Sequence, residues 1–193
     1  MVIVLLGPAG AGKDTQATLL AKRLNLPSIS TGQLCRDAIK EGDILGRFID
    51  RYTSHGKLIP TELVLELLFD RVEREDAKNG FIVNGAPRTF EQIALIDNAA
   101  RHIGEKITFV FSLEVPVIET IARLQKRAGV ENRADDKDLK FILERLTSHY
   151  HDSDDIKNEY RDRGVLYEVD GRSHVEDIQN EILRIIKTKV DLD

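Results

Sequence analysis

The sequence Gly7-Pro8-Ala9-Gly10-Ala11-Gly12-Lys13-Asp14-Thr15 follows an apolar run over Val2–Leu6 and precedes a helix-forming stretch. Glycines allow successive backbone N–H groups to turn toward one point, and the following helix directs the positive end of its dipole there. Lys13 adds a positive charge for the outer phosphates of a nucleotide, and Thr15 adds a hydroxyl for a magnesium ion. The order of strand, glycine-rich loop, lysine, hydroxyl and helix therefore predicts a phosphate-binding loop.

This loop departs in one position from the usual phosphate-binding pattern. Ser or Thr normally follows the lysine directly, whereas here Asp14 stands between Lys13 and Thr15. A tight turn between a strand and a helix is the alternative interpretation, but such a turn needs fewer glycines and no lysine. The phosphate-binding interpretation therefore requires support from the rest of the chain.

Length and composition are typical of one compact domain. The chain has 193 residues, of which 41% are hydrophobic, enough for a core without crosslinks. Cys35 is the only cysteine, so an intrachain disulfide and a cysteine-rich zinc site are both excluded. Met1 leads directly into the first apolar run, without signal-peptide features, and no apolar run approaches membrane-spanning length. We therefore expect a soluble, unprocessed protein of the reducing cytoplasm.

The charge balance indicates which partners to expect. A formal net charge of −5 argues against general binding to nucleic acid or to an acidic membrane, because both attract positive charge. A phosphate-bearing ligand must then be bound by locally placed cations. No large apolar stripe suggests a protein partner, so a monomer is expected. The candidate cations are the arginines that recur at motif positions, Arg36, Arg88, Arg123, Arg127, Arg133 and Arg145.

Short apolar runs alternate with amphipathic helical stretches along the chain. This alternation predicts an α/β fold with a parallel sheet and helices on both faces. The expected strands are Val2–Leu6, Pro27–Ser30, Phe81–Asn84, Ile107–Leu113 and Val165–Asp170, enough for a five-stranded sheet. The expected helices are Asp14–Leu24, Thr61–Asn79, Thr89–Gly104, Val115–Arg127, Lys137–Arg163 and Val175–Val190.

Two segments do not fit this rhythm. Residues 31–59 contain two short helical pieces separated by glycines, and residues 128–136 form a polar stretch between two helices. Both are placed at the side of the sheet that carries the phosphate loop, where parallel α/β sheets bind ligands. They are either moving parts of a binding site or ordinary surface loops.

Further motifs occur in order along nearly the whole chain. They are Ser30–Arg36, Gly56–Pro60, Gly80–Thr89 with Gln92, Arg133–Asp136, Arg145–Leu146 with Tyr150, and Val169–Gly171. Together with the glycine-rich loop, they make the chain similar to the nucleoside monophosphate kinases, most closely to the adenylate kinase family of P-loop kinases. The resemblance implies one P-loop kinase domain over 1–193, with a helical insertion for the monophosphate at 30–59 and a short lid at 123–136.

The resemblance also implies roles for individual residues. It implies that the lid carries Arg133 over the donor nucleotide and excludes water, with Asp135 and Asp136 as hinge and anchoring partners. Phosphoryl transfer depends on positioning and positive charge, for which arginine is well suited. The implied catalytic residues are Lys13, Arg88, Arg127, Arg133 and Arg145. The implied ATP-binding residues are Gly10, Ala11, Gly12, Lys13, Asp14, Thr15, Arg123, Arg127 and Arg172. The implied AMP-binding residues are Thr31, Arg36, Lys57, Ile59, Gly85, Arg88, Gln92, Arg133 and Arg145.

The choice of base is predicted from Thr31 and Gln92. In the resembling family, a glutamine at the position of Gln92 bonds the adenine edge of the acceptor, which favours AMP over other monophosphates. A solvent-exposed helical glutamine is the alternative interpretation.

The chain departs from the family where a metal ion is expected. The family usually has acids at the positions of Gln33 and Asn84, where they hold the water shell of magnesium, and a glycine at that of Asp14. Neutral amides orient that shell less well, so weaker metal binding or slower turnover is expected. Asp14 either restores a carboxylate beside Thr15, the one metal-site candidate, or only stabilises the start of the helix, which we favour.

The resemblance implies an enzyme that transfers the terminal phosphoryl group of ATP to AMP, reversibly giving two ADP, with Mg²⁺ supplied with ATP. One alternative is a nucleotide-binding protein of the same fold with weakened catalysis, which the neutral Gln33 and Asn84 would favour. The other is a UMP or CMP kinase, which a comparison of acceptors would distinguish.

Overall fold

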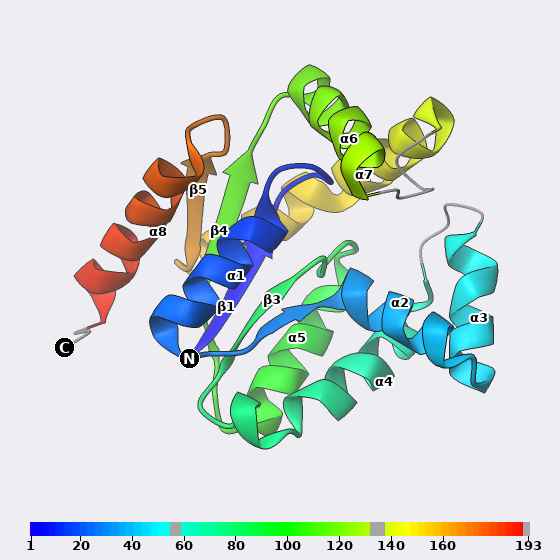
Figure 1. Ribbon diagram of the computed structural model, residues 1–193. Coiled ribbons are helices and arrows are strands. Elements are labelled where there is room, and N and C mark those ends of the chain that lie inside the picture. The colour runs from blue at the N-terminus through cyan, green and yellow to red at the C-terminus, as the bar shows by residue number, and fades with distance from the viewer. Residues whose placement is uncertain (55–58, 132–137, 191–193) are drawn as a thin grey trace.

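The computed structural model describes residues 1–54, 59–131 and 138–190. The strands form one five-stranded parallel sheet in the order β2-β3-β1-β4-β5 (Figure 1). Their bounds are β1 Val2–Leu6, β2 Ser28–Ser30, β3 Phe81–Asn84, β4 Ile107–Glu114 and β5 Leu166–Asp170. The predicted fold class and its strands are confirmed to within one or two residues.

Helices cover both faces of this sheet. Their bounds are α1 Lys13–Leu24, α2 Thr31–Glu41, α3 Ile44–Thr53, α4 Thr61–Val72, α5 Glu91–His102, α6 Val117–Glu131, α7 Leu139–Asp162 and α8 Val175–Lys189, with a short 3-10 helix at Glu75–Ala77. The side chains of β1 alternate between two buried clusters. Val2 and Val4 belong to the cluster that includes residues of α4, α5 and α7, and Ile3 and Leu5 to the one that includes residues of α1 and α8. A strand buried on both faces in this way explains its continuous apolar sequence.

Two predicted helices end at places that the sequence did not indicate. The expected helix Thr61–Asn79 stops at Val72, because Arg74 adopts an extended backbone before the short 3-10 turn. The helix expected to end at Arg127 instead continues to Glu131. The expectation of a non-helical segment from residue 128 was therefore wrong for 128–131, since Gly129 lies within the helix and no proline interrupts it. The remainder of the predicted lid, 132–136, lies outside the described residues.

The insertion between β2 and α4 contains the two predicted short helices, α2 and α3, which pack against each other. Asp43 caps α3 through its side chain, which accepts a hydrogen bond from the Gly46 backbone N–H at 2.7 Å. Cys35, Ala38 and Ile49 form a small buried cluster of their own. In Figure 1 these helices lie to one side of the sheet, below the ends of α6 and α7. The insertion is therefore a packed element beside the carboxyl ends of β2 and β3.

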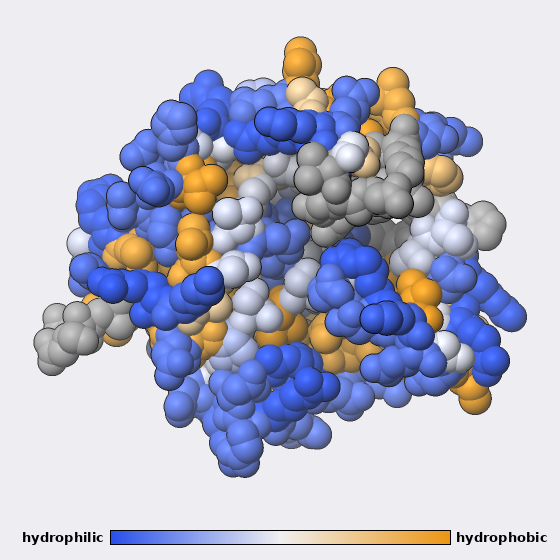
Figure 2. Space-filling view, viewed as in Figure 1, coloured by the Kyte–Doolittle hydropathy of each residue, from blue (hydrophilic) through white to orange (hydrophobic). Residues whose placement is uncertain are grey.

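The molecular surface is mainly polar on the face shown in Figure 2, where hydrophobic side chains are scattered among hydrophilic ones. No helix within the described part of the chain has both the length and the apolar character needed to cross a bilayer.

Candidate functional site

The glycine-rich loop forms a turn that begins at the end of β1 and leads into α1. Gly10 and Gly12 have φ values of 86° and 93°, a conformation that glycine adopts without steric cost. Gly12 immediately precedes α1, so the first backbone N–H groups of that helix open toward the loop. The ammonium group of Lys13 donates to the carbonyl oxygens of Gly7 and Pro8 at 2.7 and 2.8 Å. The loop therefore combines backbone N–H donors at the start of α1 with a lysine whose ammonium group bonds back to the loop.

The acceptor side begins on the neighbouring strands. Leu5 of β1 pairs with Asn84 of β3, and Ser30 of β2 pairs with the same Asn84. The residues that follow these three strands therefore emerge at one edge of the sheet. They are the glycine-rich loop after β1, Thr31 after β2 and Gly85 after β3.

Side chains from α2 and from the loop after β3 meet at this edge. The Thr31 hydroxyl donates to the Asn84 carbonyl oxygen at 3.4 Å, and a Cβ on Gly85 would lie only 2.6 Å from that hydroxyl oxygen. Gly85, with φ 82°, is thus required by both space and conformation. The Arg88 guanidinium donates through Nε to the Gly85 carbonyl oxygen at 2.7 Å. Thr31, Gly85 and Arg88 therefore lie close together.

Arg36 of α2 joins the same cluster through Cys35. Burial raises the pKa of the Cys35 thiol, and the positive charges of Arg88 and Arg36 partly oppose this rise. Both guanidinium groups are therefore near enough to this buried thiol to influence its pKa. Ile59 packs against the small apolar cluster of the insertion that contains Cys35.

Gln92 is buried rather than exposed, with 3% of its surface accessible. Its Oε1 accepts a hydrogen bond from the backbone N–H of Arg88 at 2.8 Å, which leaves the Nε2 donors for another partner. The alternative interpretation, a solvent-exposed helical glutamine, was wrong. The predicted base-selecting residue lies directly beside a predicted phosphate-binding residue.

On the opposite side of the glycine-rich loop, α6 carries Arg123 and, one turn later, Arg127. One nitrogen of Arg123 donates to Glu119 at 2.5 Å and to the Gly171 carbonyl oxygen at 3.0 Å. This hydrogen bond connects the loop after β5 to α6. Arg172 in that loop is exposed and bonds Asp170, which lowers the pKa of this carboxyl to about 2.

Comparison with known proteins shows the family. The adenylate kinase family model matches residues 5–165. The chain belongs to the adenylate kinase family. Among its relatives, the adenylate kinase of Micrococcus luteus is 36% identical over 95% of this chain and 89% of its own length. The adenylate kinase of Thermobifida fusca is 34% identical over 98% of this chain and 100% of its own length, and that of Leptospira biflexa is 35% identical over 95% and 98%. This member of the adenylate kinase family is thus an enzyme of the nucleoside monophosphate kinase type.

The structure does not describe the side chains of several predicted site residues. Lys57 and Arg133 lie outside the described residues, as do Asp135 and Asp136. Arg145 lies on α7, but the position of its side chain is not described. Their roles remain predictions.

The residues available to a metal ion include neutral amides, Gln33 and Asn84, at the two positions where carboxylates were expected. Among the residues described, no group of three or more His, Cys, Asp or Glu side chains could hold a metal. Gln33 is engaged elsewhere: its Oε1 accepts from Arg36 at 2.7 and 3.2 Å, and its Nε2 donates to Asp37 at 2.8 Å. Asn84 is 2% exposed, and its Nδ2 has no hydrogen-bond partner among the described residues. Thr15 and Asp14 are exposed at the start of α1. These residues fit a magnesium ion that is bound mainly by nucleotide phosphates and not one bound by protein carboxylates.

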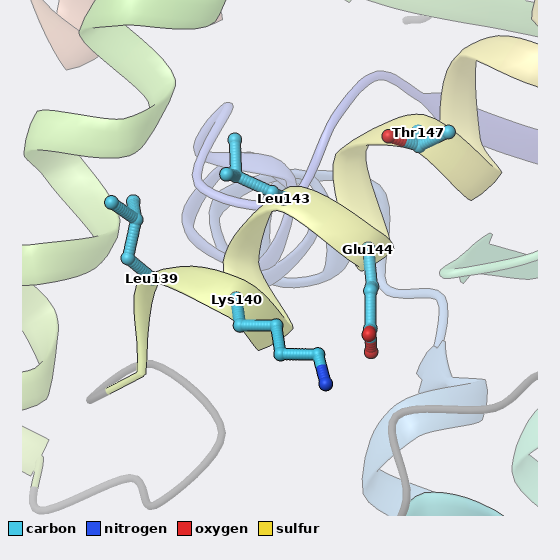
Figure 3. Close-up of a pocket in the computed structure, with 5 residues that line it drawn as sticks. All are labelled: Leu139, Lys140, Leu143, Glu144 and Thr147. Carbon is cyan, nitrogen blue, oxygen red and sulfur yellow. The ribbon is translucent and has the colours of Figure 1, made fainter.

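An open hollow of about 680 Å³ runs along the first turns of α7 and is lined by Leu139, Lys140, Leu143, Glu144 and Thr147 (Figure 3). In Figure 3, Leu139 and Leu143 extend from one side of the helix, while Lys140 and Glu144 extend from the other. None of these five residues is a predicted nucleotide contact. The candidate site is therefore defined by the glycine-rich loop and the cluster around Arg88.

The family resemblance includes Tyr150 in one motif with Arg145 and Leu146. In the structure, the neighbouring residue His149 is more buried than Tyr150. Tyr150 is 43% exposed, whereas His149 is half-buried. Burial lowers the pKa of His149 to about 4, assisted by the positive charges of Lys13 and Arg88. The available signal was the helical spacing of Ile142 and Leu146, which places position 149 on the same inward face.

Proposed function

We propose that this enzyme transfers the terminal phosphoryl group of ATP to AMP, reversibly giving two ADP, with Mg²⁺ bound to the donor nucleotide. The observation that carries the proposal is the arrangement of Lys13 and Arg88. They follow adjacent parallel strands, and the positive charges of both contribute to the lowered pKa of His149. Cations at this edge of the sheet can hold two phosphate chains end to end.

The proposed mechanism depends on positioning and on positive charge. The backbone N–H groups of Gly10–Thr15 and the Lys13 ammonium group bind the donor phosphates, while Arg36 and Arg88 bind the acceptor phosphate. An oxygen of the AMP phosphate forms a bond to the terminal phosphorus of ATP as the bond to the ADP oxygen breaks. Arg127, Arg133 and Arg145 stabilise the charge that spreads over the transferred group.

Magnesium is proposed to bind together with the donor nucleotide. A bound ion would neutralise charge on the donor phosphates. The Thr15 hydroxyl would coordinate it directly or through water, and the Asn84 side-chain oxygen could accept a hydrogen bond from its water shell. Because neutral amides stand at both Gln33 and Asn84, most of the binding would be left to the nucleotide itself.

AMP is proposed as the acceptor because Gln92 is buried beside Arg88 with Nε2 donors available. A buried amide that lacks its partner is costly, so a base that cannot pair with it is disfavoured. A protein with weakened catalysis is the alternative that the neutral Gln33 and Asn84 support.

A panel of acceptors tests the proposal. ADP formation is measured by a coupled assay with ATP and AMP, UMP or CMP, each with and without magnesium. We expect rapid turnover with AMP and magnesium and much slower turnover with the pyrimidine monophosphates. A folded protein that binds nucleotides but forms no ADP would instead be the weakened form, and faster turnover with UMP or CMP would identify a pyrimidine kinase.

A further inference from the structure

The long helix α7 has an inward face with polar residues near its middle. Among the side chains of α7 that are described, the most buried are Ile142, Leu146, Ser153, Ile156 and Tyr160, which recur at helical spacing. His149 occupies the missing position of this series, between Leu146 and Ser153. A half-buried imidazole on this inward face calls for a polar partner.

The groups around His149 are mostly cationic. Lys13 approaches from α1, Arg88 from the loop after β3, and Lys157 from α7 itself. Glu114 at the end of β4 is the acidic group that acts on the ring, and Lys157 bonds this carboxylate at 2.6 Å. Ala9 of the glycine-rich loop packs against the cluster that contains Leu146, and Ala86 of the loop after β3 lies in the cluster that contains Ile156. The half-buried His149 lies between Leu146 and Ile156 on α7, so the packing places it between these two loops.

We propose that His149 is a phosphate-binding residue, whose imidazole donates a hydrogen bond to the phosphate groups held between Lys13 and Arg88. This proposal rests on the proposed function, because it needs phosphate chains at that place. A neutral imidazole has one N–H donor and one acceptor nitrogen, so it can serve such an oxygen without adding charge to the ligand-free site.

Nucleotide binding would reverse the electrostatic environment of the ring. In the ligand-free protein, burial and the charges of Lys13, Arg88 and Lys157 hold the pKa of His149 at about 4. Bound phosphates add several negative charges beside Lys13 and Arg88, which favours the charged imidazolium and raises its pKa. If that pKa reaches about 6, roughly half a proton is taken up per site at pH 6.

Proton uptake can be measured directly. Binding of AMP together with an ATP analogue that has an imido group between its outer phosphates is followed by calorimetry at pH 6, in buffers of different ionisation enthalpy. The dependence of the measured heat on the buffer gives the number of protons taken up. We expect about half a proton more for the unmodified protein than for His149→Gln, which keeps a polar side chain but does not titrate. The phosphates titrate in both proteins, so their contribution cancels.

His151→Gln is the matched control, because His151 is on the same helix, is exposed and pairs with Asp152. Its proton uptake should equal that of the unmodified protein. Equal uptake by the unmodified protein and His149→Gln, with binding intact, would overturn this inference and leave the proposed function standing. Absence of nucleotide binding by the unmodified protein would overturn both.

A measurement on the unmodified protein covers the case in which His149→Gln does not fold. The ring resonances of the histidines are titrated by NMR with and without the same two ligands. One ring should stay neutral down to about pH 5 in the free protein and become protonated at higher pH in the complex. A ring that titrates identically in both states would contradict the proposal.

Discussion

Gln33 holds the guanidinium group of Arg36 through two hydrogen bonds, at 2.7 and 3.2 Å. An amide can orient this group without neutralising it, whereas a carboxylate would form an ion pair with it. We expect Gln33→Glu to raise the KM for AMP by about fivefold with little change in kcat. The new carboxylate would compete with the AMP phosphate for the Arg36 guanidinium group. Steady-state kinetics with varied AMP measure this, with Glu41→Gln at the exposed end of α2 as the control. A higher kcat in Gln33→Glu would instead indicate that residue 33 serves the metal ion.

Asn84 is buried where a carboxylate would assist magnesium, and its Nδ2 has no partner in the part of the chain that the structure describes. Asp has nearly the same shape as Asn, so Asn84→Asp can restore the acid without repacking. We expect the magnesium concentration that gives half-maximal activity to fall by about threefold or more, because a carboxylate holds the metal's water shell better than an amide. Activity is titrated with magnesium at a fixed ATP concentration. An unchanged midpoint would mean that Asp14 or another ligand already compensates.

Gln92 has two separable functions, since its Oε1 accepts from the Arg88 N–H and its Nε2 is the proposed contact with the base. Gln92→Glu keeps the acceptor oxygen but removes the amide donors, and Gln92→Ala removes both. We expect both variants to lower the preference for AMP over UMP, measured as the ratio of kcat/KM values, by about tenfold or more. If only Gln92→Ala lowers the ratio, the residue positions the Arg88 loop and does not select the base.

The packing of α2 against α3 depends on one glycine. A Cβ at Gly46 would lie 2.0 Å from the Ala38 carbonyl oxygen, a backbone atom that cannot move aside alone. We expect Gly46→Ala to separate these helices, to destabilise the protein by about 1–3 kcal/mol and to raise the KM for AMP, because α2 carries Arg36.

The matched control is Gly129→Ala on α6. Among the described residues, no atom outside the neighbouring helix backbone lies within 4 Å of a Cβ built there, and the position is helical. We expect Gly129→Ala to be neutral or to stabilise the protein by up to about 1 kcal/mol. Urea unfolding measures both variants. A loss of stability in Gly129→Ala as large as that in Gly46→Ala would contradict the packing explanation.

Much of the element pattern could be predicted because its causes are local. Pro60 and Thr61 indicated the start of α4, and the structure confirms it. The continuation of α6 through Gly129 to Glu131 could not be predicted from composition, because a polar, glycine-containing stretch is compatible with either helix or loop.

The stability of the whole ligand-free protein should depend on pH through His149. Its imidazole has a pKa of about 4 when folded, whereas an unfolded imidazole has a pKa near 6.5. Between these values the unfolded chain binds more protons, so the free energy of unfolding falls as the pH falls. We expect this histidine to cost about 2 kcal/mol at pH 5 relative to pH 7.5.

His149→Gln removes this dependence because glutamine does not titrate. Urea unfolding of both proteins at pH 7.5 and pH 5, without nucleotide, measures the difference. The loss of stability between these two pH values should be smaller by about 2 kcal/mol in His149→Gln. Parallel losses in the two proteins would contradict the neutral, half-buried state of this ring.

The sequence by itself determined the sheet, the phosphate-binding loop and the family, because apolar periodicity, glycine spacing and short motifs act over neighbouring residues. Only the tertiary structure decided that Gln33 is bonded to Arg36 and that Gln92 is bonded to Arg88. It also decided that His149, and not Tyr150, faces Lys13 and Arg88. These outcomes depend on the orientation of one helix against strands and loops far away in the chain, which local sequence patterns do not specify.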